Sequence, residues 1–330
     1  MIGALALCGA LAAPAGADDC AGVPGYELHV PATGAIGQCV DVTLLGPANQ
    51  LGLFMISLGD GPLPWCNGHT ICLDFPLVLA FVFPFDDTGT FEFGGCLDCD
   101  PSLVGLTVYL QYLAVSPVPA VSNQCPFTIV DGICDGDLCT FTNGGWGSTC
   151  RGKNPGCRRD KHFDHVFPGG LTIGDPDGID GDGDYALHFS SSAAVEAFLP
   201  GKGTPATLDA DAHDPTDSSA GVFAGQLVAA TLNVAFDDAG ELDDCKGRTD
   251  LLLGDLVLVG GVDDDLLGYS VRDLLGLANA VISGALGSGP YDLDGDSVAD
   301  VTLSDISDAL AVVNENFDDG TSNQGNLGLP

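Results

Sequence analysis

The chain of 330 residues is long enough for two domains of ordinary size, and its 45% apolar content excludes a wholly disordered protein. Its 46 acidic residues against nine Lys and Arg residues leave a formal net charge of −37, which excludes nucleic acid and anionic lipid as partners. Of the acids, 41 are Asp and five are Glu. Because Asp favours turns and calcium-binding loops whereas Glu favours helices, this bias predicts acidic loops, with a saline habitat as the alternative explanation.

The first 17 residues form an apolar stretch that ends in the small residues Ala15-Gly16-Ala17, before Asp18 and Asp19. Such a stretch is typical of a secretory signal peptide and is too short to span a bilayer. We therefore predict a signal peptide over residues 1–17 with cleavage after Ala17. The mature protein is expected to be secreted, extracellular or on the cell surface, without a membrane span.

The chain has thirteen cysteines, and removal of Cys8 with the signal peptide leaves twelve. An even number at irregular spacing is typical of disulfides in exported proteins. For the CxxC pair Cys96 and Cys99 we expect a structural disulfide, because no second pair completes a zinc site. The sequence predicts six disulfides among Cys20, Cys39, Cys66, Cys72, Cys96, Cys99, Cys125, Cys134, Cys139, Cys150, Cys157 and Cys245.

Residues 18–131 contain short apolar runs separated by turn residues, and they contain no Lys or Arg. Many short strands at such spacing are typical of two packed antiparallel sheets. We predict an N-terminal antiparallel β-sandwich domain over residues 18–131, with strands within 39–45, 51–58, 72–85, 90–93, 103–115 and 127–130.

Residues 132–320 differ in the spacing of their apolar residues, and their apolar stretches are longer. Ser191 or Ser192 can cap a helix over 193–199, which Pro200 ends. We expect further helices over 220–236, 271–282 and 304–317, and a strand over 251–259. The predicted fold class is therefore α+β and multidomain. The sandwich is followed by a mixed, helix-richer α/β domain over residues 132–320, which carries acidic loops and ends in a helical pair, and by a flexible tail over residues 321–330.

The last two predicted helices match each other at an offset of 32 residues. Ser270 and Asp273 in the first copy correspond to Thr302 and Asp305 in the second. A degenerate duplication explains the match. Two independent helix starts explain it nearly as well, because capping favours the same residue types at these positions.

An acidic run, Asp292-Leu-Asp294-Gly-Asp296-Ser-Val-Ala-Asp300, lies just before the final helix. Carboxylates on alternate residues allow a short loop to surround calcium with oxygen ligands. The run resembles the calcium loops of dockerins and EF-hands, but Ser297 replaces the usual Gly and Leu303 replaces the closing acid, a role that Asp305 fills only in a stretched loop. The resemblance implies calcium as the cofactor; a solvated acidic turn is the alternative. The implied ligands are Asp292, Asp294, Asp296 and Asp300.

A second acidic run has five Asp residues in ten positions, with Gly between several of them. Without bound cations such a run repels itself. It resembles the calcium-wrapping repeats of thrombospondin-type extracellular loops, and an exposed linker is the alternative. The resemblance implies calcium ligands at Asp175, Asp177, Asp180, Asp182 and Asp184.

His162 and His165 lie three residues apart, so one face of a helix would carry both. A transition-metal site is one interpretation, but the sequence identifies no third ligand, which favours a solvated amphipathic helix. Motifs for a GxSxG nucleophile, an HExxH metal site and a phosphate loop are absent from the sequence. We therefore expect no catalytic residues.

Several segments of the second domain resemble an uncharacterised module of secreted bacterial proteins. The segments are Cys139-Thr-Phe-Thr-Asn-Gly-Gly-Trp-Gly147, Val166-Phe-Pro168, Ser191 to Pro200, Pro215 to Gly225 and Leu232 to Phe236. Pro101 to Gln111 similarly resembles β-rich segments of secreted bacterial proteins. These resemblances imply export and modular construction, and they imply no activity.

The sequence thus predicts a secreted or cell-surface, non-catalytic structural or adhesion protein whose acidic loops are ordered by calcium. One alternative is a dockerin-like anchoring module of a polysaccharide-handling assembly. The other is a secreted hydrolase with unidentified carboxylates. The expected partner is an extracellular polysaccharide or another surface protein.

Overall fold

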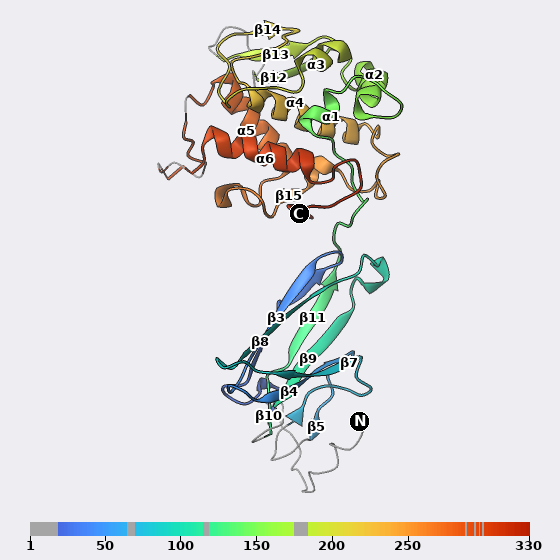
Figure 1. Cartoon of the computed structure of the whole chain (residues 1–330), viewed down its shortest axis with the longest axis vertical. Helices are drawn as coiled ribbons and strands as arrows, with labels where there is room; N and C mark the ends of the chain where they lie inside the picture. The colour runs from blue at the N-terminus through green and yellow to red at the C-terminus, as the bar shows by residue number, and fades with distance from the viewer. Residues whose placement is uncertain are drawn as a thin grey trace. The chain divides into compact units, whose positions relative to one another are not determined.

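The computed structural model describes residues 19–64, 70–114, 119–174, 184–287, 289–293, 295–296, 298 and 300–330. The predicted signal peptide lies outside the described residues. The chain divides into two compact units, residues 1–132 and 133–330. This boundary falls next to the one expected from the sequence at residues 131–132. Figure 1 labels the elements of both units.

Unit 1 is a sandwich of two sheets. The smaller sheet has the order β1-β3-β8, formed by Glu27–His29, Cys39–Leu45 and Thr90–Cys96. The larger sheet has the order β2-β11-β9-β4-β7, formed by Thr33–Ala35, Cys125–Val130, Thr107–Ala114, Leu51–Ser57 and Leu79–Pro84, with β10 (Ala120–Val121) beside β9. A hairpin of β5 (Leu63–Pro64) and β6 (Thr70–Ile71) completes the described strands of this unit. The predicted sandwich is confirmed, and it includes one parallel pair, β2 with β11.

Aromatic rings fill the space between the two sheets of unit 1. Phe54, Phe83 and Tyr112 from three neighbouring strands are at most 1% exposed. Phe83 stacks on Phe91 of the opposite sheet with ring centroids 4.8 Å apart. The Tyr112 hydroxyl donates to the carbonyl of Leu45, and burial raises the pKa of Tyr112. Alternation along each strand therefore places the larger aromatic residues inside.

Unit 2 is built around one central helix, α4 (Val222–Asp238), whose residues are mostly buried. The C-terminal helices α5 (Val271–Ser283) and α6 (Leu303–Glu315) pack against it and against each other. A small sheet of order β12-β13-β14, formed by Leu171–Gly174, Ala186–Phe189 and Ala212–His213, contacts α4 and α5 through β12. The remaining helices are α1 (Asn143–Trp146), α2 (Pro155–Val166) and α3 (Ser192–Phe198), with 3-10 turns at Leu253–Asp255 and Asp264–Leu266. The predicted helix-richer second region and its helical pair are confirmed.

The polar residues within the apolar sequence of α4 are hydrogen-bonded in the core. The Asn233 amide accepts from the Trp146 indole at 2.9 Å and donates to the Phe141 carbonyl at 2.9 Å. Asp237 forms an ion pair with Lys246 at 2.7 Å, and each side chain is 1% exposed. These contacts explain why such a helix is a core element. None of the described helices is long and apolar enough to cross a membrane.

Three details of the predicted second domain need correction. The small sheet β12-β13-β14 was not anticipated, and the expected strand over 251–259 is only β15 (Val257–Leu258) after a 3-10 turn. The expected flexible tail over 321–330 instead carries β16 (Leu327–Gly328), which pairs with β15. Its Asn323 side chain donates to the carbonyl of Ile133 at 2.6 Å. The tail is ordered because it returns to the start of unit 2 and buries Leu327, which is 1% exposed.

The described residues form four assigned disulfides, Cys20–Cys72, Cys39–Cys96, Cys139–Cys245 and Cys150–Cys157. Cys99 and Cys134 are also disulfide-bonded, and Cys66 lies outside the described residues. The expected Cys96–Cys99 pair is wrong, because β3 and β8 place Cys39 opposite Cys96. The expected disulfide of Cys125 is also wrong, since this residue is a free thiol. Its Sγ lies 3.2 Å from the carbonyl oxygen of Leu28, and neither β1 nor β9 beside it contains a cysteine.

Candidate functional site

The loop with the acidic run 292–300 is closed at its base by a short antiparallel bridge between Tyr291 and Val301. The Tyr291 N–H donates to the Val301 carbonyl at 2.8 Å, and the Asp300 N–H donates to the Tyr291 carbonyl at 2.9 Å. Helix α6 follows directly, with Thr302 as its N-cap. The loop is therefore held at both ends while its Asp292 and Asp296 side chains are exposed.

Each of the described carboxylates in this loop accepts a hydrogen bond from the loop backbone. Asp292 accepts from Gly295 at 2.7 Å, and Asp296 accepts from Val298 at 2.7 Å. Asp300 reaches back across the loop to the N–H of Leu293 at 2.5 Å. Asp294 lies outside the described residues. Among the residues that are described, no three or more His, Cys, Asp or Glu side chains are arranged to hold a metal ion. These three carboxylates alone therefore do not form a ready site, and a cation here would need Asp294 as well.

Asp305, considered as a replacement for the closing acid, instead caps helix α6. Its carboxylate accepts from the Thr302 hydroxyl at 2.6 Å and from the Thr302 N–H at 2.8 Å. These bonds lower the pKa of Asp305. The equivalent residues Ser270 and Asp273 form the same capping box at the start of α5. The two copies therefore begin their helices identically, but the loop before α5 has Gly260 and Val262 at the positions that correspond to Asp292 and Asp294.

The charged residues of the C-terminal part of the chain are all acidic. After Arg272 the sequence has ten acidic residues and no Lys, Arg or His. Arg272 itself is engaged, because its guanidinium contacts Asp238 at 2.7 Å and Asp255 at 2.8 Å. No Lys, Arg or His follows Arg272 in the sequence to offset these carboxylates, so the loop carries a net negative charge.

Most of the second acidic run lies outside the described residues, namely Asp175, Asp177, Asp180 and Asp182. Asp184 is described, and it is half-buried between this run and strand β13. The next residue, Tyr185, donates its N–H to the Ser283 carbonyl at the end of α5 at 2.9 Å. Tyr185, which follows the run, therefore lies at the end of α5.

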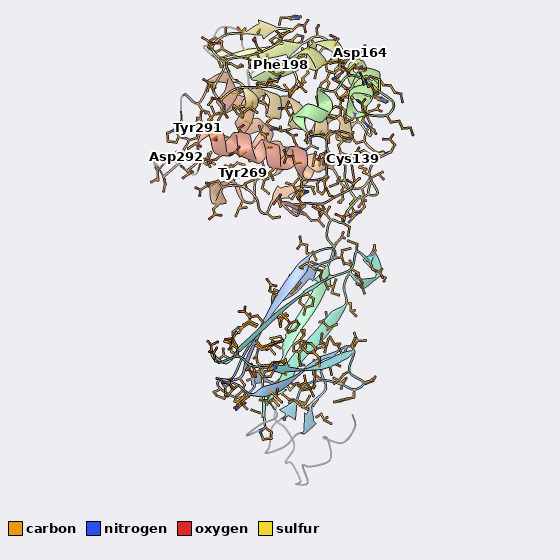
Figure 2. The ribbon with its side chains drawn as sticks, viewed as in Figure 1. Cys139, Asp164, Phe198, Tyr269, Tyr291 and Asp292 are labelled. Carbon is orange, nitrogen blue, oxygen red and sulfur yellow. A yellow bond between two sulfur atoms is a disulfide. The ribbon has the colours of Figure 1, made fainter. Side chains whose placement is uncertain are left out.

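His162 and His165 on α2 share a partner that the sequence did not reveal. The Nδ1 atoms of His162 and His165 lie 2.6 Å and 3.0 Å from the two carboxylate oxygens of Glu241, which follows α4. The two histidines thus share one carboxylate at hydrogen-bonding distance. Figure 2 shows Asp164 of the same helix and Asp292 at opposite sides of unit 2, so this cluster is separate from the acidic loop.

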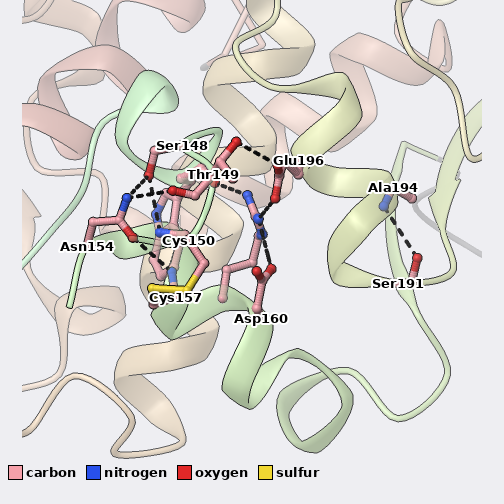
Figure 3. Close-up of polar contacts among 12 residues, drawn as sticks. Ser148, Thr149, Cys150, Asn154, Cys157, Asp160, Ser191, Ala194 and Glu196 are labelled. Atoms are coloured by element: carbon pink, nitrogen blue, oxygen red, sulfur yellow. Dashed lines mark hydrogen bonds and ion pairs between the residues drawn. A yellow bond between two sulfur atoms is a disulfide. The ribbon is translucent and has the colours of Figure 1, made fainter. Parts of the chain in front are cut away.

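A second polar cluster joins helices α2 and α3 (Figure 3). The Arg159 side chain is 0% exposed and pairs with Asp160 at 2.8 Å and with Glu196. The Thr149 hydroxyl donates to Glu196 at 2.9 Å, and the adjacent Cys150–Cys157 disulfide closes the start of α2. Sequence reasoning missed this cluster because its members are up to 47 residues apart. Asp160 and Glu196 both pair with Arg159. This arrangement is typical of a structural ion-pair network and not of a catalytic acid and base.

Described residues line a hollow in each unit. The hollow in unit 1, of about 540 Å³, lies at the β7–β8 turn and is lined by Phe85, Asp86, Phe91 and Glu92 among others. The hollow in unit 2, of about 170 Å³, lies between the end of α3 and the start of α4 and contains one acid, Asp217. Asp318, whose pKa is raised by burial and by Asp319, lines neither hollow.

Comparison with known proteins shows no matching family model and no matching curated protein. Among solved structures, a PKD domain of an M14-like peptidase from Thermoplasmatales archaeon SCGC AB-540-F20 has 14% identity, a TM-score of 0.19 and coverage of 32% of this chain and 93% of its own. A superoxide reductase from Ignicoccus hospitalis has 10% identity, a TM-score of 0.21 and coverage of 34% and 87%. A CARDB domain from Pyrococcus furiosus, solved with di-metal ions, has 10% identity, a TM-score of 0.19 and coverage of 32% and 85%.

Proposed function

We propose that this chain is a secreted or cell-surface, non-catalytic structural or adhesion protein in which calcium orders the acidic loops. The proposal is supported above all by the loop 292–300, which carries alternating carboxylates between a backbone bridge and a capped helix. Calcium takes six to eight oxygen ligands, and carboxylates in a short loop supply them. Asp292, Asp294, Asp296 and Asp300 are the residues that would hold the ion.

Calcium at this loop would act on the core of unit 2 through helix α6. The helix begins two residues after Val301, and Ile306, Leu310 and Val313 on its inner face are 0% exposed. Binding to the folded loop alone would stabilise α6 and the elements packed on it by mass action. The role of the ion is therefore structural, and the disulfides support the same extracellular setting.

The dockerin-like alternative requires a helical pair with an exposed apolar face. In this chain, Val271, Leu274 and Val281 of α5 are 0% exposed, as are the inner residues of α6. Both helices belong to one hydrophobic core together with α4. The packing therefore favours a structural role over anchoring by a separable helical pair.

The hydrolase alternative requires two carboxylates that face a common pocket, one of them with a raised pKa. In the hollow of unit 1 the pKa of Asp86 is lowered by hydrogen bonds from Thr90 and Thr88. In the hollow of unit 2 Asp217 is the single acid. The hollow of unit 1 therefore lacks a raised pKa at Asp86, and the hollow of unit 2 lacks a second carboxylate.

The test is a thermal melt of the mature chain with calcium and with EDTA at fixed ionic strength. Calcium at about one hundred times its Kd should stabilise unit 2 by about 2.7 kcal/mol. For a unit of this size that corresponds to a melting temperature higher by roughly 5–10 °C. An EDTA melt that coincides with the calcium melt would refute the proposal.

The variant Asp294→Asn combined with Asp296→Asn should remove most of the calcium response. Asp308→Asn is the matched control, because Asp308 is an exposed acid on α6 outside the loop. The control should retain the response. If the loop variant also retains it, the ion binds at the run from Asp175 to Asp184 instead.

A further inference from the structure

Strand β7 (Leu79–Pro84) is an edge strand of the larger sheet in unit 1. Among the strands that are described, β4 alone pairs with it. Residues 75–85 contain no charged side chain, and Asp74 and the Asp86-Asp87 pair flank them. Natural edge strands are usually blocked by lysines, by proline, by a bulge or by a covering segment, because an open apolar edge accepts another strand. Pro84 lies at the end of β7, and at its start Val78 donates its N–H to the Ile56 carbonyl at 2.8 Å although Ile56 pairs with Leu79. The open stretch is therefore the short segment between them.

The backbone of β7 offers hydrogen-bonding groups on its free side. Phe85 donates its N–H to Gln50 of the β4 side at 2.9 Å. Because successive residues of a strand alternate in direction, Phe83 and Phe81 also bond toward β4, whereas Ala80 and Val82 direct their N–H and C=O groups to the free edge. Pro84 shares that direction and has no N–H, so it cannot donate to an added strand. The free edge therefore has room for a short added strand beside Ala80 and Val82.

Both faces of β7 would continue into apolar contacts with an added strand. On the outer face, Val82 is 63% exposed, and Leu51 of the paired strand β4 is 49% exposed. On the inner face, Leu79 is 48% exposed, and the half-buried Phe81 lies 5.3 Å from Phe93 of β8. An added strand with apolar side chains would cover these residues on both faces.

The negative charge of unit 1 favours a partner segment that carries Lys or Arg. Residues 18–131 contain twelve acids and no Lys or Arg. The hollow at the end of β7 combines the rings of Phe85 and Phe91 with the carboxylates of Asp86 and Glu92. Hydrogen bonds from Thr90 and Thr88 lower the pKa of Asp86, which keeps this carboxylate ionised. A Lys or Arg side chain would suit such a hollow, with its aliphatic stem along Phe91 and its cation beside the acids, whereas Phe85 is 2% exposed and forms the floor.

We propose that the free edge of β7 binds an extended segment of a partner protein, with apolar residues along the strand and a Lys or Arg that enters the hollow of Phe85, Asp86, Phe91 and Glu92. Unit 1 of a second copy is a poorer partner, because its residues 18–131 carry twelve acids and no Lys or Arg. This binding is independent of the calcium loop, which lies in unit 2.

The first experiment measures binding of the mature chain to a fluorescent peptide of alternating Val and Thr residues with Lys at both ends. The same peptide with Glu in place of Lys is the control for charge. The Lys peptide should bind and the Glu peptide should not. Failure of the Lys peptide to bind would overturn the proposal.

Two variants locate the binding at the edge. Val82→Pro removes the edge-facing N–H and should weaken binding about tenfold, while the bonds to β4 remain. Glu92→Gln, at an exposed position, should weaken binding about threefold. Glu27→Gln removes the same charge from the exposed edge of β1 and should leave binding unchanged. A thermal melt of each variant checks that it is folded. If Val82→Pro does not fold, the effect of Glu92→Gln on peptide binding tests whether the peptide binds at this edge.

Two results would overturn the proposal. Equal weakening by Glu27→Gln and Glu92→Gln would show general attraction to an acidic protein. A dimer in sedimentation that Val82→Pro dissociates would show that a second copy covers the edge. Calcium and EDTA should not change peptide binding, so failure here and failure of the calcium melt are distinguishable.

Discussion

At the scale of single residues, Cys125 shows how a cysteine count misleads. Twelve mature cysteines favour six disulfides, yet the Cys125 thiol lies beside the Leu28 carbonyl and the Asn123 amide, at 3.2 Å from each. Burial raises the pKa of this thiol. A raised pKa lowers the fraction of reactive thiolate at neutral and mildly alkaline pH.

We therefore predict that Cys125 is alkylated slowly in the native protein at pH 8 and rapidly after unfolding without reductant. Peptide mapping by mass spectrometry after timed iodoacetamide treatment measures both rates. Cys125→Ser should change the free energy of unfolding by less than about 1 kcal/mol, because Ser is similar in size. Recovery of Cys125 in a disulfide, or its fast alkylation in the native protein, would contradict this account.

The Asn233 amide is a second residue whose role only the packing explains. Its side-chain oxygen accepts hydrogen bonds from the Phe141 N–H and the Trp146 indole. Its side-chain nitrogen donates to the side-chain oxygen of Asn314 in α6 at 2.9 Å. In the sequence it is a polar residue within an apolar stretch, and nothing nearby explains it. In the structure it forms hydrogen bonds with buried groups of two distant segments. Its contribution to stability therefore depends on residues 81 to 92 positions away in the sequence.

At the scale of elements, the two capping boxes connect the sequence repeat to stability. Thr302 and Asp305 satisfy three backbone or hydroxyl donors at the start of α6. Removal of such a cap costs about 1 kcal/mol. We predict this loss for Thr302→Ala in urea unfolding, and little change for Ser304→Ala, which alters an exposed neighbour on the same turn.

The same cap predicts a pH dependence. Hydrogen bonds from Thr302 lower the pKa of Asp305 in the folded state. The stabilisation is therefore complete above the unfolded pKa of about 3.9 and is lost as the pH falls through the lower folded value. Melts of the parent and Asp305→Asn should differ at pH 6 and converge below about pH 3. A difference that persists or grows in acid would rule out this role for Asp305.

At the scale of the whole molecule, the two units have separate hydrophobic cores. The cluster around α4 draws only on unit 2, and the cluster of Met55, Ile71, Leu73, Leu113 and Val121 draws only on unit 1. Units with their own cores usually unfold as separate cooperative transitions.

We predict two calorimetric transitions for the mature chain, of which EDTA moves only the one that belongs to unit 2. Fragment proteolysis after each transition assigns the two units. Raised salt at constant calcium should move both upward, because it screens the repulsion of an excess of acids. A single transition that EDTA shifts as a whole would show that the units unfold together.

The sequence by itself determined the fold class, because its local patterns are strong. Alternating apolar runs before residue 131 and capped apolar helices after it identify the strands β3 and β4 and the helices α3 to α6 to within a few residues. Export and disulfide bonding were predicted from composition, and the disulfides are present. The acidic loops were visible because their ligand spacing lies within ten residues of chain.

The tertiary structure alone decided the contacts that join distant segments. It gave His162 and His165 their common partner Glu241, placed Arg159 between two carboxylates, and left Cys125 without a cysteine beside it. It also left β7 as an open edge, which depends on strand order and not on the strand itself. The physical reason is the same in each case: local patterns report which residues are buried, whereas pairing depends on which surfaces folding brings together.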